Sequence, residues 1–179
     1  MRRGLLAFAA VAALGLAALV AWDFIKPGRE IPPLAEASRR ATSIVVEKEA
    51  RRLTLLQGER IIKTYRASLG GNPIGHKQRE GDSRTPEGRY TIDGRNSRSR
   101  FHLSLHISFP DAADRARAAQ NAVPPGSDIM VHGLRNGLGW LGGLHLFRDW
   151  TDGCIAVTNA EMEEIWALVD TGTPVQIKP

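Results

Sequence analysis

The chain contains one cysteine, Cys154, and one of its five histidines, His132, ends an apolar segment; together these two residues could perform nucleophilic chemistry. A thiol attacks as thiolate, so it needs a group that lowers its pKa or takes its proton. Histidine is the usual partner because its unperturbed pKa lies near neutrality. His132 closes "IMVH" and Cys154 opens "CIAV", so pairing of these segments as neighbouring strands would bring imidazole and sulfur together. We expect such a thiol to react with iodoacetamide faster than a model thiol at neutral pH.

The residues beside Cys154 suit acyl chemistry, which needs hydrogen-bond donors for a developing oxyanion. Gly153 has no side chain, so the backbone can turn sharply and present the amides of Gly153 and Cys154 to a carbonyl oxygen. Thr151 and Asp152 can fix that turn through side-chain hydrogen bonds to the backbone. Gly133 of the "VHG" segment is a further candidate for binding the oxyanion or the substrate. The competing interpretation is that the cysteine is a small buried hydrophobic residue.

The N-terminus predicts export across a membrane. Two arginines precede an uncharged apolar run, which keeps this end in the cytoplasm and sends the rest across. Residues 1–25 are therefore a signal peptide or a retained signal anchor, and a poor cleavage pattern favours the anchor. Residues 26–41 read as a linker with three prolines, and residues 42–179 as one folded domain. An exported chain stabilised by disulfides would carry paired cysteines, which this chain does not.

The charge balance, 24 Lys+Arg against 19 Asp+Glu, favours an anionic partner. Nucleic acid is not expected, because the arginines are dispersed and form neither a basic helix nor an aromatic stacking platform. No metal or other cofactor is expected either: His102 and His106 share one strand face but stand about 13 Å apart by strand rise, too far to chelate one ion.

The pattern of apolar residues predicts a mainly β fold, an antiparallel sandwich or barrel with two short peripheral helices, preceded by the N-terminal hydrophobic helix. Strands are expected at residues 43–48, 52–56, 60–68, 89–94, 101–109, 128–133, 154–158 and 174–179. Helices are expected at 111–120 and 159–172, the second capped by Asn159. The polar loop 71–88 is long enough to be functional. The Gly-rich segment 134–152 could cover the site as a lid, with Trp140 and Trp150 contacting substrate or simply packing; we do not count its His145 among the site residues.

Several ordered segments resemble the catalytic core of the L,D-transpeptidases, the YkuD-like domain. They are "VHG", "TDGCIAVTN" and "GTPVQI", with "SLGGNPIGHKQREGDSRTPEGRYTID" and "HISFPDAADRARA" upstream. The resemblance covers residues 42–179 and implies a β-rich catalytic domain with Cys154 as nucleophile, His132 as general base, and Gly153 with Cys154 as oxyanion amides. It further implies attack on a tetrapeptide stem of peptidoglycan, giving a thioester. An amine then resolves the thioester into a crosslink or a protein attachment.

Two positions depart from the family pattern and indicate a divergent branch. Asp152 stands where members commonly have a second histidine, and Ala156 where many have an arginine suited to a substrate carboxylate. The interval from His132 to Cys154 is also longer than usual. Water could therefore replace the amine, and a hydrolytic member would release stem-peptide crosslinks or wall-attached protein. A non-catalytic peptidoglycan-binding module is the alternative from another class.

The expected partners follow from this resemblance and from the N-terminus. They are peptidoglycan stem peptides, wall-attached protein, and the inner membrane through the N-terminal segment. The expected location is the bacterial cell envelope, on its periplasmic side.

Overall fold

The computed structural model describes residues 30–179. The predicted signal or anchor segment, residues 1–25, and the start of the predicted linker lie outside the described residues. Within residues 30–179, no helix has both the length and the apolar character needed to cross a membrane.

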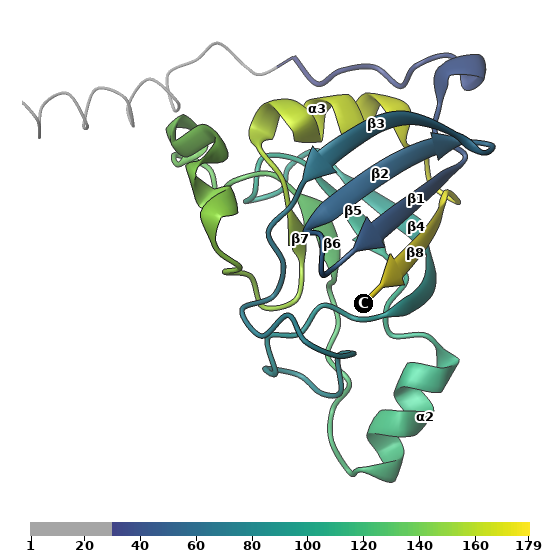
Figure 1. Ribbon diagram of the computed structural model, residues 1–179, viewed down its shortest axis with the longest axis vertical. Coiled ribbons are helices and arrows are strands. Elements are labelled where there is room, and N and C mark those ends of the chain that lie inside the picture. The colour runs from purple at the N-terminus through teal and green to yellow at the C-terminus, as the bar shows by residue number, and fades with distance from the viewer. Residues whose placement is uncertain (1–29) are drawn as a thin grey trace, which may run out of the picture.

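The described chain folds as one curled eight-stranded sheet, which confirms the predicted mainly β class (Figure 1). The strands are β1 (Ser43–Glu47), β2 (Arg52–Gln57), β3 (Arg60–Arg66), β4 (Gly88–Asn96), β5 (Ser104–Ile107), β6 (Met130–His132), β7 (Ile155–Ala156) and β8 (Pro174–Lys178). Their order in the sheet is β3-β2-β1-β8-β4-β5-β6-β7. Most neighbours are antiparallel, but β1 with β8 and β6 with β7 are parallel pairs.

Alternating apolar residues hold the sheet together on its inner side. In β1, Ile44 and Val46 are fully buried while the residues between them are partly exposed, the period of two expected for a strand with one covered face. Helix α3 (Asn159–Leu168) contacts β5 and β6 and buries three side chains, Met162, Ile165 and Trp166. Helix α2 (Ala112–Gln120) projects from the other end of the sheet (Figure 1).

Two local predictions are wrong. The N-cap of α3 is Thr158, which forms a capping box with Glu161, while the Asn159 side chain instead accepts the Leu134 amide at 2.8 Å. The predicted strand 101–109 is reduced to β5, because His102 has a φ of 68° and its ring bonds the Glu163 carboxylate at 2.8 Å. The left-handed backbone of His102, whose ring is held by α3, interrupts the extended conformation, so the strand begins only at Ser104.

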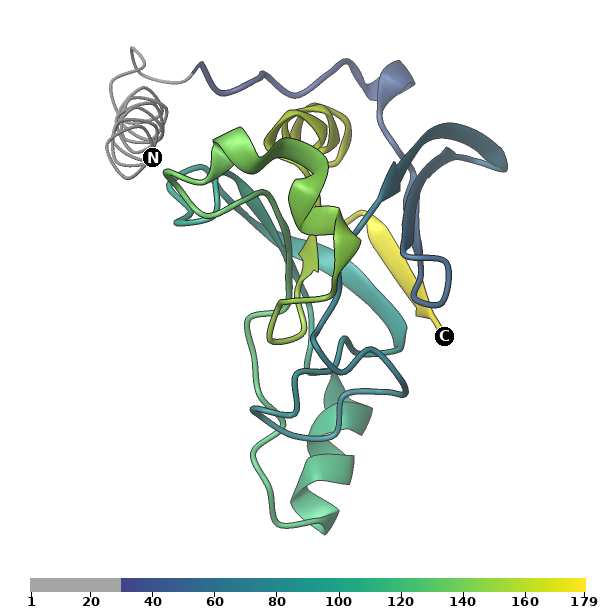
Figure 2. The same ribbon diagram turned by 60° about the vertical axis from the view of Figure 1, so that its left-hand side comes forward.

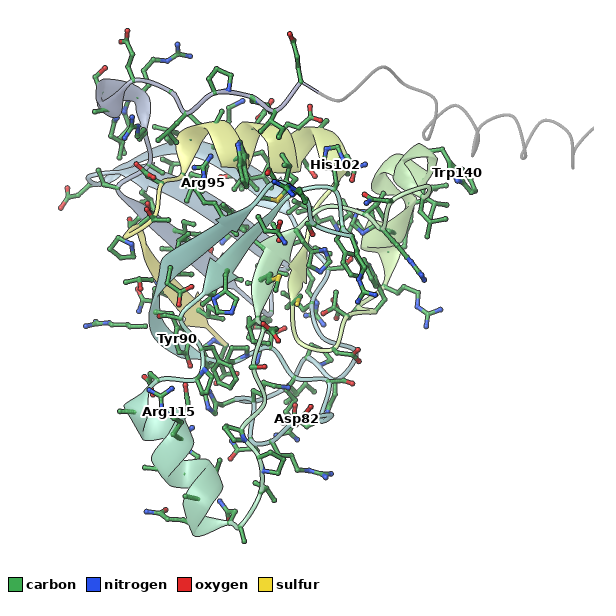
Figure 3. All side chains as sticks on the ribbon, turned by 180° about the vertical axis from the view of Figure 1, so that it is seen from behind. Asp82, Tyr90, Arg95, His102, Arg115 and Trp140 are labelled. Carbon is green, nitrogen blue, oxygen red and sulfur yellow. The ribbon has the colours of Figure 1, made fainter. Side chains whose placement is uncertain are left out.

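The segment predicted as a lid contains a helical element, η2 (Gly139–Phe147), that the sequence pattern did not reveal. It consists of 3-10 turns that meet at a non-helical Gly142, which has a φ of 49°. A further short 3-10 turn, η1 (Ala37–Arg39), precedes the sheet. Leu144 and Phe147 are exposed on η2, and Figure 3 shows Trp140 at its outer edge. In Figure 2 this element stands beside the sheet rather than within it.

Candidate active site

The parallel pair β6 and β7 places His132 and Cys154 on one face of the sheet. Val131 pairs with Ile155 and His132 with Ala156, which puts Cys154 one residue before the paired segment. Val131 and Ile155 are fully buried in the core, so their sequence neighbours His132 and Cys154 point to the opposite face. Strand spacing and rise put their Cα atoms about 8 Å apart on this diagonal, a span that an imidazole and a thiol can bridge.

His132 is held as a neutral base. Its Nδ1 lies 2.6 Å from the Gly133 carbonyl oxygen, to which it donates its proton, so Nε2 carries the free lone pair. The ring packs on Phe101, with 4.6 Å between centroids, and on Trp150, with 5.9 Å. Burial, with a smaller contribution from the nearby His145, lowers the pKa of His132 to about 4, although the hydrogen bond to the Gly133 carbonyl acts in the opposite direction. At neutral pH the imidazole is therefore uncharged and able to accept a proton.

Cys154 is held as a thiol rather than a thiolate. Its Sγ lies 3.4 Å from the carbonyl oxygen of Asp128. Burial raises the pKa of Cys154 to about 11, and the carboxylates of Asp152 and Asp128 act in the same direction. The Met130 backbone and the Lys77 ammonium oppose them. This argues against the expected fast-reacting thiol: for Cys154 to attack, its proton would have to leave during the attack itself, and His132 is the candidate base.

Thr151 fixes the turn that carries the thiol. Its hydroxyl accepts the Gly153 N–H at 3.1 Å and donates to the Cys154 carbonyl at 2.7 Å. The Gly153 amide is therefore already bonded, whereas the Cys154 amide has no acceptor within residues 30–179. The Cys154 N–H is thus the available oxyanion donor, and the Gly153 N–H can join it only if Thr151 releases it. Asp152 is exposed, and its carboxylate accepts from the Ser83 hydroxyl at 3.5 Å.

The polar loop 71–88 supports this turn through backbone contacts. Gly153 has a φ of 130°, and a Cβ there would lie 2.5 Å from the Arg84 carbonyl oxygen. A Cβ on Gly70 would meet the Ser83 carbonyl oxygen at 2.2 Å, and the Gly70 N–H donates to the Thr85 hydroxyl at 3.0 Å. The loop and the cysteine turn therefore interlock with no space for a side chain between them.

Gly133, which the sequence suggested as an oxyanion or substrate-binding residue, lies beside His132, and its role in binding stays a prediction. Its carbonyl orients His132, and a Cβ would lie 2.6 Å from the Asn159 side-chain oxygen. Sequence reasoning also missed Phe101 and Lys77, the second of which is nearly buried and paired with Asp82 at 2.9 Å. No spacing in the sequence links either residue to Cys154.

A separate hollow of about 550 Å³ lies on the outer face of β1, β2, β3 and β8. Its lining residues are Val45, Glu47, Arg52, Thr54, Leu56, Ile61, Thr64 and Lys178. In the sheet order these strands are distant from β6 and β7, so the hollow is not part of the thiol site.

Alkylation of Cys154 by iodoacetamide should be slow at neutral pH. With a thiol pKa of about 11 rather than the ordinary 9.0, the thiolate fraction falls roughly 100-fold. The greater nucleophilicity of the more basic thiolate offsets about tenfold of this loss. At pH 7.5 we expect the alkylation rate to be about tenfold below that of a model thiol, and to rise with pH up to about 11. Intact-mass spectrometry over time measures this rate. Rapid alkylation that levels off near pH 6 would instead demonstrate a resting thiolate–imidazolium pair.

The sequence of residues 41–177 matches the family model of the L,D-transpeptidase catalytic domain, YkuD. The chain belongs to the L,D-transpeptidase family. This agrees with the resemblance carried by the segments around His132 and Cys154, and L,D-transpeptidases act on peptidoglycan.

A relative in Escherichia coli and two solved structures are similar to large parts of this chain. YafK of Escherichia coli (strain K12), a candidate L,D-transpeptidase, is 31% identical over 142 residues, which are 76% of this chain and 50% of YafK. The structure of Bd1075 from Bdellovibrio bacteriovorus superposes with a TM-score of 0.53 at 25% identity, covering 82% of this chain and 51% of Bd1075. Pgp2 of Campylobacter jejuni, a helical cell shape determining protein, shares the fold with a TM-score of 0.58 at 19% identity, covering 92% of this chain and 56% of Pgp2. This chain thus spans about half the length of each relative.

Proposed function

We propose that this protein is a cysteine acyltransferase of the bacterial envelope that acts on the tetrapeptide stems of peptidoglycan. The observation that supports it best is the register of β6 and β7, in which a neutral imidazole and a thiol share one face of adjacent strands. The free Cys154 amide and the family membership add to that support.

In the first step, Cys154 Sγ attacks the carbonyl carbon of the scissile peptide bond while its proton passes to His132 Nε2. The carbonyl oxygen becomes an oxyanion, which the Cys154 N–H stabilises. When the C–N bond breaks, the leaving amine takes the proton from His132, and the acyl group remains as a thioester on sulfur.

In the second step, an amine attacks the thioester carbonyl carbon and passes a proton to His132 Nε2. The C–S bond breaks, an amide forms, and His132 gives this proton to the departing thiolate. Asp152 and Asp128 lie close enough to Cys154 to raise its pKa, and both side chains reach solvent. At neutral pH the incoming amine is an ammonium, which these carboxylates attract. It attacks only after it has lost a proton, which one of the carboxylates can accept, and this favours transfer. The same carboxylates can accept a proton from water, so hydrolysis of crosslinks or of wall-attached protein is the second candidate.

The location belongs to the same proposal. The N-terminal apolar run after two arginines would export the domain and hold it at the inner membrane on the periplasmic side. The excess of basic residues suits an anionic wall polymer there.

The test is incubation of the full chain with tetrapeptide muropeptides and, separately, with wall-linked protein, followed by mass spectrometry of the products. New crosslinks or attachments, absent with Cys154→Ser, are the expected result and indicate transfer. Freed stems or freed protein would assign hydrolysis instead. Intact substrate in every case, under conditions where the protein is folded, would contradict both.

A further inference from the structure

His145 is a buried histidine that the proposed mechanism does not use. It lies on η2, whose neighbouring residues Leu144 and Phe147 are exposed, yet only 8% of its own surface is accessible. Its carbonyl oxygen accepts the Ser68 hydroxyl at 3.0 Å. Ser68 bridges Ala156, the residue that pairs with His132 on its other side. The hydrogen bond from Ser68 to the His145 carbonyl therefore holds η2 next to the strands that contain Ala156 and His132, the proposed base.

Trp150 connects His145 to His132. The indole ring lies 6.0 Å from the His145 centroid and 5.9 Å from the His132 centroid, so both imidazoles pack against one side chain. The two histidines are near enough for His145 to lower the pKa of His132. His145 therefore belongs to the wall of the same site.

The contact with Trp150 also determines which nitrogen of His145 carries the proton. The indole Nε1, which can only donate, points at His145 Nδ1 at 3.3 Å. Nδ1 must therefore be an acceptor, and the proton of the neutral ring must sit on Nε2. Burial lowers the pKa of His145, which keeps the ring neutral.

The resulting Nε2–H is a buried donor without a partner in the part of the chain that the structure describes. Buried polar groups are nearly always hydrogen-bonded, so an unpaired donor in a site wall needs an explanation. Substrate binding provides one, since a peptide offers carbonyl and carboxylate oxygens.

We propose that His145 binds substrate, its Nε2–H donating to an oxygen of the peptide stem while Trp150 holds the ring in the required tautomer. This rests on the proposed function, because it takes the peptide stem as the ligand. The lid thereby supplies an imidazole to a site that has Asp152, rather than histidine, in the cysteine turn.

Two substitutions separate donation to substrate from a purely structural role. In His145→Gln the side-chain amide can place an N–H near the position of Nε2, but the acceptor for Trp150 is lost. In His145→Asn the amide oxygen can accept from Trp150, but nothing reaches the Nε2 position. We expect His145→Asn to lower kcat/KM for a tetrapeptide muropeptide about 10- to 100-fold, mainly through KM, and His145→Gln to stay within about threefold of wild type.

If both variants melt at the wild-type temperature, three results would overturn the assignment. They are activity kept by His145→Asn and lost by His145→Gln, an equal loss in both variants, or no loss in either. The first would make His145 an anchor for Trp150 only.

A second measurement decides the matter even if the variants fold poorly. In Cys154→Ala protein labelled with ¹⁵N-histidine, NMR should show the Nε2–H tautomer of His145, and its signal should shift on titration with the muropeptide. Binding that leaves this signal unchanged would refute the inference alone. Absence of binding, together with absence of wild-type turnover, would refute the proposed function along with it.

Discussion

Cys154→Ala is expected to reduce turnover of a tetrapeptide muropeptide by about 10⁴-fold or more, because no other group in the described chain can form the thioester. A carbapenem, which is a strained acyl donor, should give a single covalent adduct with the wild-type protein and none with this variant, as seen by intact-mass spectrometry. The substitution removes one sulfur from a partly buried position, so the fold should remain intact.

His132→Gln is the matched comparison. Removing a general base costs typically about 10²- to 10⁴-fold, while the nucleophile remains. This variant should therefore still form the carbapenem adduct, slowly and faster at high pH, where the thiol ionises without help. If Cys154→Ala kept its activity on muropeptides, the chain would work without its thiol, and a non-catalytic wall-binding module would become the better interpretation.

Gly153→Ala is expected to lower the melting temperature by about 6–12 °C, corresponding to roughly 3 kcal/mol, and to remove activity. An alanine Cβ would lie 2.5 Å from the Arg84 carbonyl oxygen and 3.0 Å from Ile129 Cδ1, at a φ of 130° that side chains rarely adopt. Scanning calorimetry and the muropeptide assay measure the two effects.

Gly71→Ala is the control for that substitution. Gly71 lies in the same region, but its φ is ordinary and its nearest contact would be at 4.0 Å. It should melt within about 2 °C of wild type, in line with an ordinary surface change. Equal melting temperatures for the two variants would contradict the interlocked arrangement of the loop and the cysteine turn.

The sequence predicted those parts of the fold in which local pattern and packing agree. Alternation in β1 and the apolar segments at β6 and β7 indicated strands because their buried residues repeat with the period of the sheet. The same reasoning overextended β5, since nothing in the pattern shows that α3 captures the His102 ring. It also chose Asn159 as a helix cap, although Thr158 and Glu161 carry the spacing of a capping box.

The sequence predicted which two residues form the candidate site, but not the burial, charges and neighbouring side chains that surround them. Two apolar segments ending in His132 and beginning with Cys154 indicated their adjacency. The protonation states depend on burial and on long-range neighbours such as Lys77 and Asp128, which no local spacing encodes. The position of His145 likewise follows from η2, a glycine-rich element without helical periodicity.

The parallel register of β6 and β7 has a consequence for divergence within the family. Ladder hydrogen bonds, including that from the Val157 amide to the His132 carbonyl at 3.0 Å, fix the distance between the backbones of His132 and Cys154. The polypeptide connecting them does not set that distance. Insertions or deletions between residues 134 and 150 can therefore reshape the surface beside the candidate site while His132 and Cys154 stay in place, so the length of this segment is free to change without moving the two side chains apart.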